Sequence, residues 1–279
     1  MEIVEKSKYP ELMGFPHTLQ VLKVVGIDRK FVDSRTWKLK ALSILDLSEN
    51  LISKLPDELT SKLPNLQELY FAGNQTEHVP LTFFTGKFAK NLKLLDLSRN
   101  GLKFLPNQLA NLEGLVTLKL DQNLLERLPV GIGKLQKLRH LSVSGNNLAT
   151  LPFALKKSIL LDTFDVSQNP FMNCENKGHK ILDTLCFPPL LDLATIFCLK
   201  NKIRMDPEDL PGTVRRHIES YLRCRCGQIC LTSKAVILVP SPLSFVATQV
   251  TADTGDILFE TVVCSKSCLE KYKNNPFAL

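Results

Sequence analysis

The nine residues Leu115-Val116-Thr117-Leu118-Lys119-Leu120-Asp121-Gln122-Asn123 follow the pattern L-x-x-L-x-L-x-x-N. Six copies of this pattern occur in register, and their final residues are Asn50, Asn74, Asn100, Asn123, Asn146 and Asn169. Successive asparagines are 24, 26, 23, 23 and 23 residues apart. A pattern that recurs at such a period predicts a solenoid, in which every repeat supplies one short strand and stacks on its neighbours.

A seventh, degenerate copy precedes the six. Leu19, Leu22 and Val24 keep the phase of the pattern, but Ile27 stands where the asparagine is expected, 23 residues before Asn50. A terminal repeat must adapt one side to water, which explains such a departure. The sequence therefore predicts an α/β leucine-rich-repeat solenoid of about seven repeats, whose natural product is an extended binding surface.

The polar residues between the leucines are expected to form the concave face of the solenoid, because strand side chains alternate with a period of two. Most of these positions hold the same small or acidic residues from copy to copy. Five positions depart from that pattern and are candidate substrate-binding residues: Tyr70, Arg99, Lys119, Asp121 and His140. Aromatic and charged side chains clustered in mid-array suit a protein partner. No nucleophile or carboxylate constellation surrounds His140 in the sequence, so binding is favoured over catalysis.

Composition favours a nuclear or cytoplasmic protein that neither binds nucleic acid directly nor spans a membrane. The net charge of +7 is spread thinly, whereas nucleic-acid binding requires a basic stripe. The N-terminus carries Glu2 and Glu5 where a signal peptide needs cations. No apolar run approaches the roughly 20 residues of a membrane span. In a reducing compartment the eight cysteines are expected to be free or metal-bound rather than paired.

Two helical segments are predicted after the repeats end at Asn169. In the first, the residues at helical spacing that share one face are Leu190, Leu193, Ala194, Phe197 and Cys198. Three further apolar residues lie off that stripe, which is typical of a helix buried on more than one side. The second segment begins at Leu210 and Pro211, where proline suits the first helical turn, and continues with the apolar Val214 and Ile218.

The C-terminal part contains two matched cysteine pairs, Cys226-x3-Cys230 and Cys264-x3-Cys268, separated by 33 residues. Two β-branched, apolar runs between them, 235–239 and 257–263, are predicted strands. Short cysteine pairs that flank strands suit a structural zinc site with four cysteine ligands, whose binding energy folds a module too small for its own core. Cys224 is an alternative ligand. The other interpretation is that these residues are free thiols packed as small hydrophobic side chains.

Taken together, the chain resembles the leucine-rich-repeat substrate receptors of cullin-RING ubiquitin ligases. The resemblance rests on the repeats, the two-helix segment and the cysteine motifs at 226–231 and 264–268. It implies that the first helix is a von Hippel–Lindau-type box that binds elongin C, with Ala194 where cysteine or serine is more usual. It also implies that Leu210, Pro211, Val214 and Ile218 form a cullin-2 box.

Five segments are predicted: an N-terminal segment (1–18), repeats (19–172), a connector (173–188), the elongin/cullin box helices (189–222) and a cysteine-rich zinc module (223–279). The resemblance implies a non-catalytic substrate-recognition subunit. Its partners would be elongin B/C, cullin-2 with its RING subunit, and a protein substrate, with replisome disassembly as the process. The alternative is an intracellular scaffold or signalling adaptor with no ligase role, in which the two helices merely cap the solenoid.

Overall fold

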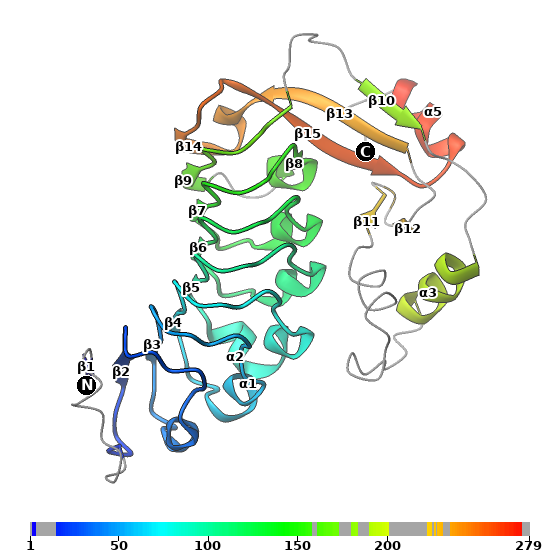
Figure 1. Ribbon diagram of the computed structural model, residues 1–279. Helices are drawn as coiled ribbons and strands as arrows, with labels where there is room; N and C mark the ends of the chain where they lie inside the picture. Colours follow the sequence, from blue (N-terminus) through cyan, green and yellow to red (C-terminus); the bar gives the residue numbers. More distant parts are fainter. Residues whose placement is uncertain are drawn as a thin grey trace.

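The parallel sheet of the repeats dominates the fold. The computed structural model describes residues 2–3, 15–157, 161–172, 180–183, 190–200, 222–224, 226, 228–230 and 235–274. Among these residues, a nine-stranded parallel sheet has the order β1-β2-β3-β4-β5-β6-β7-β9-β14. The strand bounds are β1 (Glu2–Ile3), β2 (Val21–Val24), β3 (Ile44–Asp46), β4 (Glu68–Tyr70), β5 (Leu94–Asp96), β6 (Thr117–Lys119), β7 (His140–Ser142), β9 (Leu161–Asp165) and β14 (Ala247–Thr251). Figure 1 shows strands β2 to β7 and β9 stacked along one side, with short helices opposite.

The register of this sheet confirms the columns expected from the repeat pattern. One row across the sheet contains Ile44, Glu68, Leu94, Thr117, His140 and Thr163. The degenerate first repeat also takes its expected place, since Val21 of β2 pairs with Ile44. Equivalent positions of successive repeats therefore lie side by side on the concave face.

The convex side is built from short helical segments. These are 3-10 helices at Ser34–Lys38, Leu81–Phe84, Asn107–Asn111, Val130–Lys134 and Phe153–Lys157, together with α1 (Glu58–Lys62) and α2 (Gly86–Asn91). Pro80, Pro106 and Pro129 precede three of the 3-10 helices in an extended conformation. A 3-10 helix rises about 2.0 Å per residue, so five residues cover the return path in a short repeat. The 26-residue spacing between Asn74 and Asn100 accommodates both a 3-10 helix and α2.

Leucines and asparagines hold the repeats together. Leu115, Leu118 and Leu120 are fully buried in the core that runs through the solenoid. The Nδ2 group of each motif asparagine donates to carbonyls of its own repeat and the preceding one, while its Oδ1 accepts a backbone N–H from the preceding repeat. These residues are Asn50, Asn74, Asn100, Asn123, Asn146 and Asn169. They form a ladder that satisfies buried backbone groups between the strands.

Residues 235–263, hereafter the capping segment, close the C-terminal end of the solenoid. β13 (Ala235–Pro242) and β15 (Asp256–Val263) are antiparallel, which confirms the two predicted strands. β10 (Lys180–Asp183) pairs with β13, and β15 pairs with β8 (Leu151–Pro152). β14, between them, adds to β9 as the last strand of the concave sheet (Figure 1). Side chains of this segment, including Val246 and Phe259, belong to the repeat core, so the sheets run across the predicted boundary at residue 223.

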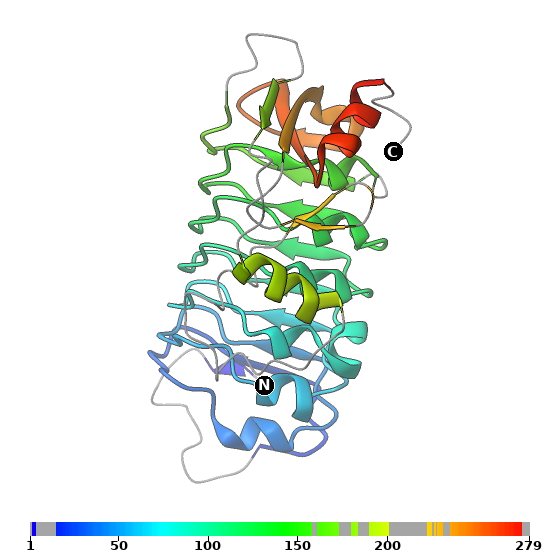
Figure 2. The same ribbon diagram turned by 90° about the vertical axis from the view of Figure 1, so that its right-hand side faces the viewer.

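The first predicted helix after the repeats is present as α3 (Leu190–Lys200). Its apolar stripe faces outward, with Leu193 50% and Phe197 62% exposed, whereas Asp192 and Thr195 are buried. The nearly all-round apolar pattern is typical of a helix buried on more than one side, but the structure leaves the stripe residues Leu193 and Phe197 exposed and buries the polar Asp192 and Thr195. Figure 2 shows α3 in front of the repeats. No helix among the described residues is both long and apolar enough to cross a bilayer.

Candidate functional site

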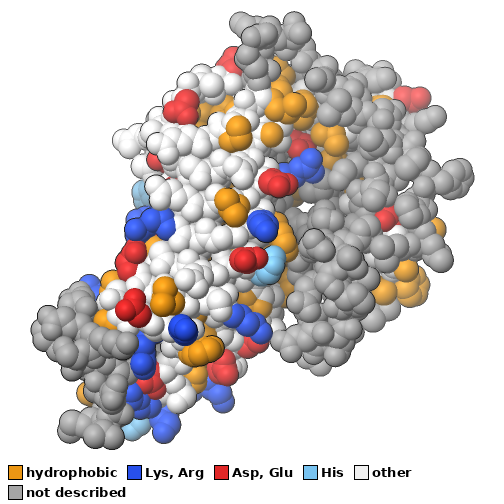
Figure 3. All heavy atoms as spheres, in the orientation of Figure 1, with side chains coloured by type: hydrophobic (Ala, Val, Ile, Leu, Met, Phe, Trp, Pro, Cys, Tyr) orange, Lys and Arg blue, Asp and Glu red, His pale blue; other side chains and the backbone are white. Residues whose placement is uncertain are grey.

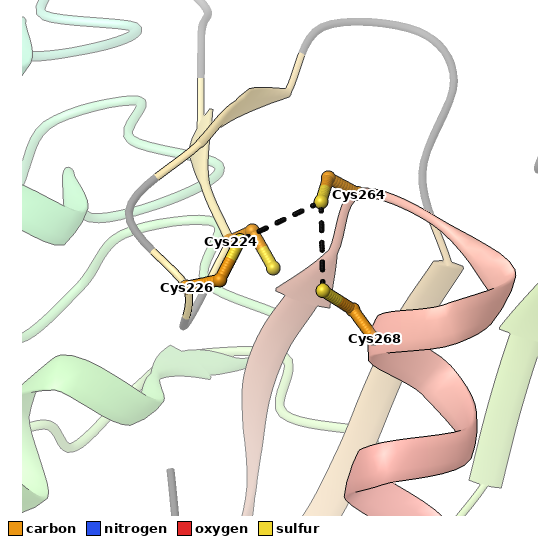
Figure 4. A group of neighbouring side chains, drawn as sticks. All are labelled: Cys224, Cys226, Cys264 and Cys268. Atoms are coloured by element: carbon orange, nitrogen blue, oxygen red, sulfur yellow. Dashed lines mark hydrogen bonds between the residues drawn. The ribbon is translucent and has the colours of Figure 1, made fainter.

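Four cysteines converge beside the capping segment. Their sulfur atoms, from Cys224, Cys226, Cys264 and Cys268, all lie within 4.8 Å of one another. The Sγ of Cys264 is 3.6 Å from that of Cys226 and 3.7 Å from that of Cys268. Figure 4 shows that two side chains come from the turn after β11 (Leu222–Arg223), and two from the end of β15 and the start of α5 (Lys266–Asn274). This group is hereafter the cysteine cluster.

The fourth member of the cluster is Cys224 rather than Cys230. β11 and β12 (Ile229–Cys230) are antiparallel with Leu222 opposite Cys230, so Cys224 lies closer to the turn than Cys230 does. The backbone N–H of Cys224 donates to the carbonyl of Gln228 at 2.8 Å and closes that turn. Cys230 is instead 2% exposed in a small apolar core, with its thiol 3.8 Å from the same carbonyl. The place of Cys224 in the turn, next to Cys226, explains the difference, which cysteine spacing alone did not reveal.

The pKa values of the cluster show that its cysteines do not all ionise to thiolates unless a cation is bound. Burial raises the pKa of the Cys224 thiol to about 12. Burial, followed by hydrogen bonds with Cys226 and Cys268, raises the pKa of Cys264 to about 11. Burial also raises the pKa of Cys226, but hydrogen bonds from the Gln228 backbone and the neighbouring thiols outweigh it, so the net direction is downward. Four thiolates could coexist here only around a positive ion.

On the concave face, two of the five candidate substrate-binding residues contact side chains of other repeats. Asp121 accepts hydrogen bonds from the hydroxyls of Ser98 and Ser142 and, at 3.0 Å, from the backbone N–H of Ser144. Its carboxylate is thus engaged in joining neighbouring repeats. Arg99 has a left-handed backbone (φ 52°) and forms an exposed ion pair with Glu49, two repeats away.

The other three candidates present polar atoms to the surface. The Tyr70 hydroxyl donates to the Glu68 carboxylate at 3.0 Å. Burial, then this hydrogen bond and the nearby carboxylates, raise the pKa of Tyr70 to about 12, so the phenol is neutral. Lys119 is half-exposed, with its Nζ 4.0 Å from Asp96, and the exposed His140 ring lies 2.9 Å from the hydroxyl of Thr163.

A hollow of about 240 Å³ occupies the C-terminal end of the concave face. Its polar lining comes from Thr117, Lys119, His140, Ser142, Thr163, Asp165, Gln249 and Thr251. Gln249 and Thr251 belong to β14 and were missed from the sequence, because Gln249 pairs with Thr163 across 86 residues of chain. Lys119 and His140 are thus brought together at one place. On the view in Figure 3, described residues of both charge signs are interspersed, without a continuous basic stripe.

The structure describes the predicted elongin-binding residues but not the predicted cullin-binding residues. Leu190, Leu193, Ala194, Phe197 and Cys198 all lie in α3, where Leu193, Ala194 and Phe197 are exposed and Cys198 is half-buried. The cullin-binding candidates Leu210, Pro211, Val214 and Ile218 lie outside the described residues. Their role stays a prediction.

Comparisons with known proteins agree with the repeat architecture. Residues 64–125 and 90–148 match the family model for the leucine rich repeat. These residues are leucine-rich repeats. The chain is 37% identical over 91 residues to leucine-rich repeat protein 1 of Mus musculus, a match that covers 33% of this chain and 21% of the mouse protein. It is 38% identical over 81 residues to a probable serine/threonine-protein kinase of Dictyostelium discoideum, covering 28% of this chain and 2% of that one.

Two solved structures are similar to part of this chain. An internalin from Listeria monocytogenes matches 57% of this chain and 44% of its own, with a TM-score of 0.50 and 21% identity. A leucine-rich repeat protein of Leptospira interrogans matches 57% of this chain and 47% of its own, with a TM-score of 0.46 and 27% identity. The likeness to the internalin supports a solenoid fold for the matched part of this chain. The chain spans well under two thirds of each of these proteins.

Proposed function

We propose that this chain is a substrate-recognition subunit of a cullin-2-RING ubiquitin ligase. The observation that carries the proposal is the exposed apolar stripe of α3, at the position where the sequence resembles an elongin-binding box. Leu193 and Phe197 are one helical turn apart and both are at least half-exposed. Scattered exposed apolar residues are ordinary on a protein surface, but an apolar helix face beside buried polar residues suits a partner that covers it.

In the scaffold alternative, the helices after the repeats cover the end of the solenoid and have no other role. The described end of the solenoid is already covered by β14 and β15, whose side chains join the repeat core. The solenoid therefore does not need α3 as a cap, and capping does not explain why α3 has an apolar stripe. Similarity to leucine-rich repeat protein 1, together with the two box patterns in the order expected of such receptors, supports the ligase proposal.

In this proposal the concave face binds a protein substrate, around Tyr70 and the hollow that contains Lys119 and His140. The chain itself performs no chemistry. It raises the effective concentration of a substrate lysine near the ubiquitin-conjugating enzyme that the RING subunit brings. Replisome disassembly in the nucleus is the process that the family resemblance suggests.

We also propose a structural zinc ion as the cofactor. The donor set of the cysteine cluster, four sulfur atoms, is the one that structural zinc sites use. When bound, the ion would supply cross-linking between the cysteine-bearing elements. Four thiolate ligands leave no position for a substrate or a reactive water, so a catalytic role is not proposed.

Co-purification with elongin B/C and cullin-2 tests the proposed function. Leu193→Asp places a charge on the exposed stripe of α3, and it is expected to abolish elongin and cullin binding. Leu124→Asp is a matched control, because Leu124 is 46% exposed but lies on the repeats, and it should leave binding unchanged. Pro211→Ala combined with Val214→Asp should lose cullin-2 while elongin B/C is retained.

Two results would count against the proposal. If the unchanged chain retains neither elongin nor cullin-2, the chain is a scaffold with another partner. If Leu193→Asp and Leu124→Asp reduce binding equally, the effect comes from general destabilisation, and the α3 stripe is not the docking surface.

A further inference from the structure

We propose that Cys224, Cys226, Cys264 and Cys268 bind one zinc ion, which fastens the C-terminal end of the docking segment to the capping segment. The docking segment is residues 184–221, between β10 and β11, and it includes α3. Only the name of that segment rests on the proposed function. The zinc ion and its four ligands are those of the site proposed above, and the fastening of β11 by this ion goes beyond that proposal.

The sulfur positions fit a tetrahedral zinc site. Zn–S bonds of about 2.3 Å place the sulfur atoms of a regular tetrahedron roughly 3.8 Å apart. The separations of Cys264 from Cys226 and Cys268 are 3.6 Å and 3.7 Å. A disulfide needs sulfur atoms about 2.05 Å apart, so neither contact is one. Four sulfur atoms within 4.8 Å of one another leave room for a single ion between them.

Cys224 is the ligand because of its place in the β11–β12 turn. The hydrogen bond from the Cys224 N–H to the Gln228 carbonyl shapes a turn from which both Cys224 and Cys226 reach the cluster. Cys230 is outside the cluster and packs with Ile237 and Val262 in the small core. The two cysteines therefore have the same chemistry but different predicted roles, which makes them a matched pair for experiment.

The start of α5 completes the site. Ser265 precedes this helix, and its Oγ accepts a hydrogen bond from the N–H of Cys268 at 3.2 Å. This geometry caps the helix N-terminus.

The elements around the cluster need the ion because their own core is small. The buried members of that core are Cys224, Cys230, Ile237, Val262, Val263, Leu269 and Tyr272. The rest of the capping segment is held by the repeat core instead, through residues such as Leu243 and Ile257. Metal binding supplies folding free energy where apolar burial is insufficient. The ion is thus expected to stabilise β11, β12 and the start of α5 far more than the concave sheet.

Fastening these elements fixes both ends of the docking segment. Its N-terminal end is held by pairing of β10 with β13. Its C-terminal end runs into β11, directly before Cys224, and the ion would tie that end to Cys264 at the end of β15. Because β13 and β15 are neighbours in one sheet, both anchors lie on the same rigid element. The ion would therefore tie β11, where the docking segment ends, to the same sheet that holds its beginning.

Zinc analysis of purified full-length variants tests the ligand set. The unchanged chain is expected to carry one zinc per molecule by inductively coupled plasma mass spectrometry. Cys224→Ser should lower bound zinc about tenfold or more, whereas Cys230→Ser should retain it, with far-UV circular dichroism confirming that both fold. Loss in Cys230→Ser with retention in Cys224→Ser would overturn the ligand set. A folded, unchanged chain without zinc, grown in zinc-supplemented medium, would overturn the metal site.

Hydrogen exchange tests the fastening. Removing zinc with a chelator should speed amide exchange at 222–224 and 228–230 by about tenfold or more, and leave β4 to β7 unchanged. Unchanged exchange in the β11–β12 pair would refute the fastening role even if zinc binds. Elongin binding is measured separately on the zinc-loaded chain. Zinc binding without elongin binding would remove the proposed function and leave the metal site standing.

Discussion

Replacing one asparagine of the ladder should destabilise the solenoid, while replacing its neighbour should not. Asn146 is 4% exposed, and adjacent Asn147 is exposed. The Asn146 side chain accepts a hydrogen bond from the backbone N–H of Leu125 at 3.1 Å. It donates to the carbonyls of Leu120 and Val143 at 2.9 Å and to that of Ser144 at 3.3 Å. Asn146→Ala removes all of these bonds, and Asn147→Ala provides a control of the same residue type.

The expected loss of unfolding free energy depends on which hydrogen bonds each backbone group keeps in Asn146→Ala. The Leu120 carbonyl still accepts from Asn123, and the Val143 carbonyl still accepts from Asn169. The Ser144 carbonyl still accepts from the Gln122 N–H at 2.7 Å. The Leu125 N–H, however, loses its side-chain acceptor in a buried position. An orphaned buried group costs about 1–3 kcal/mol and each lost hydrogen bond about 0.5–1.5 kcal/mol, so Asn146→Ala should cost roughly 2–4 kcal/mol.

Equilibrium urea unfolding, followed by circular dichroism, measures this difference. With a slope of about 1–3 kcal/mol per molar urea, the midpoint for Asn146→Ala should fall by roughly 1 M or more. Asn147→Ala should lie within about 0.5 kcal/mol of the unchanged protein. Equal midpoints for the two variants would refute the ladder as a source of stability. Hydrogen exchange at Leu125 should rise in Asn146→Ala alone, which locates the effect.

Further substitutions test other parts of the fold. Gly73→Ala and Gly86→Ala should each cost about 1–2 kcal/mol in unfolding free energy, because both glycines have a positive φ, at 66° and 69°. Gly73→Ala should cost only slightly more, since its Cβ would displace the flexible carboxylate end of Glu49 whereas Gly86 has open space. Because burial and a carboxylate raise the pKa of Tyr70 from 10.0 to about 12, stability should be full below pH 10 and fall as pH rises toward 12. Tyr70→Phe should remove that fall in urea midpoints compared at about pH 9 and about pH 11. Leu118→Ala should cost about 2–5 kcal/mol by urea unfolding, and the exposed Leu124→Ala less than about 1 kcal/mol.

The repeats were predictable because their determinants are local. Leucines and an asparagine recur at fixed offsets within each repeat, so each copy specifies the same strand and turn. Each repeat then packs against neighbours of the same structure, which stabilises it further. The row that joins Glu68, Leu94 and His140 follows directly from this register. The use of Asp121 within the fold did not follow, because its hydrogen bonds with Ser98, Ser142 and Ser144 depend on which side chains face it from the neighbouring repeats.

The end of the solenoid was less predictable because it depends on contacts between distant residues. β14 lacks the leucine pattern, yet Ala247 pairs with Leu161 and the strand completes the concave sheet. Matched C-x3-C spacing likewise favoured Cys230 as a ligand. The position of Cys224 in the turn, which selects it instead, depends on the pairing of β11 with β12. Spacing along the chain cannot specify such a pairing.

The exposed apolar residues of α3 change how its sequence pattern is interpreted. An apolar stripe at helical spacing predicts burial in most helices, because the same residues that bind a partner also pack well against a core. Here Thr195 is buried and Phe197 is exposed, so the stripe contributes little to the fold of the described chain. A capping helix would show the opposite arrangement. With the solenoid end closed by β14, the apolar stripe is explained by a surface that a partner covers, and Leu193→Asp should change partner binding without changing the stability of the repeats.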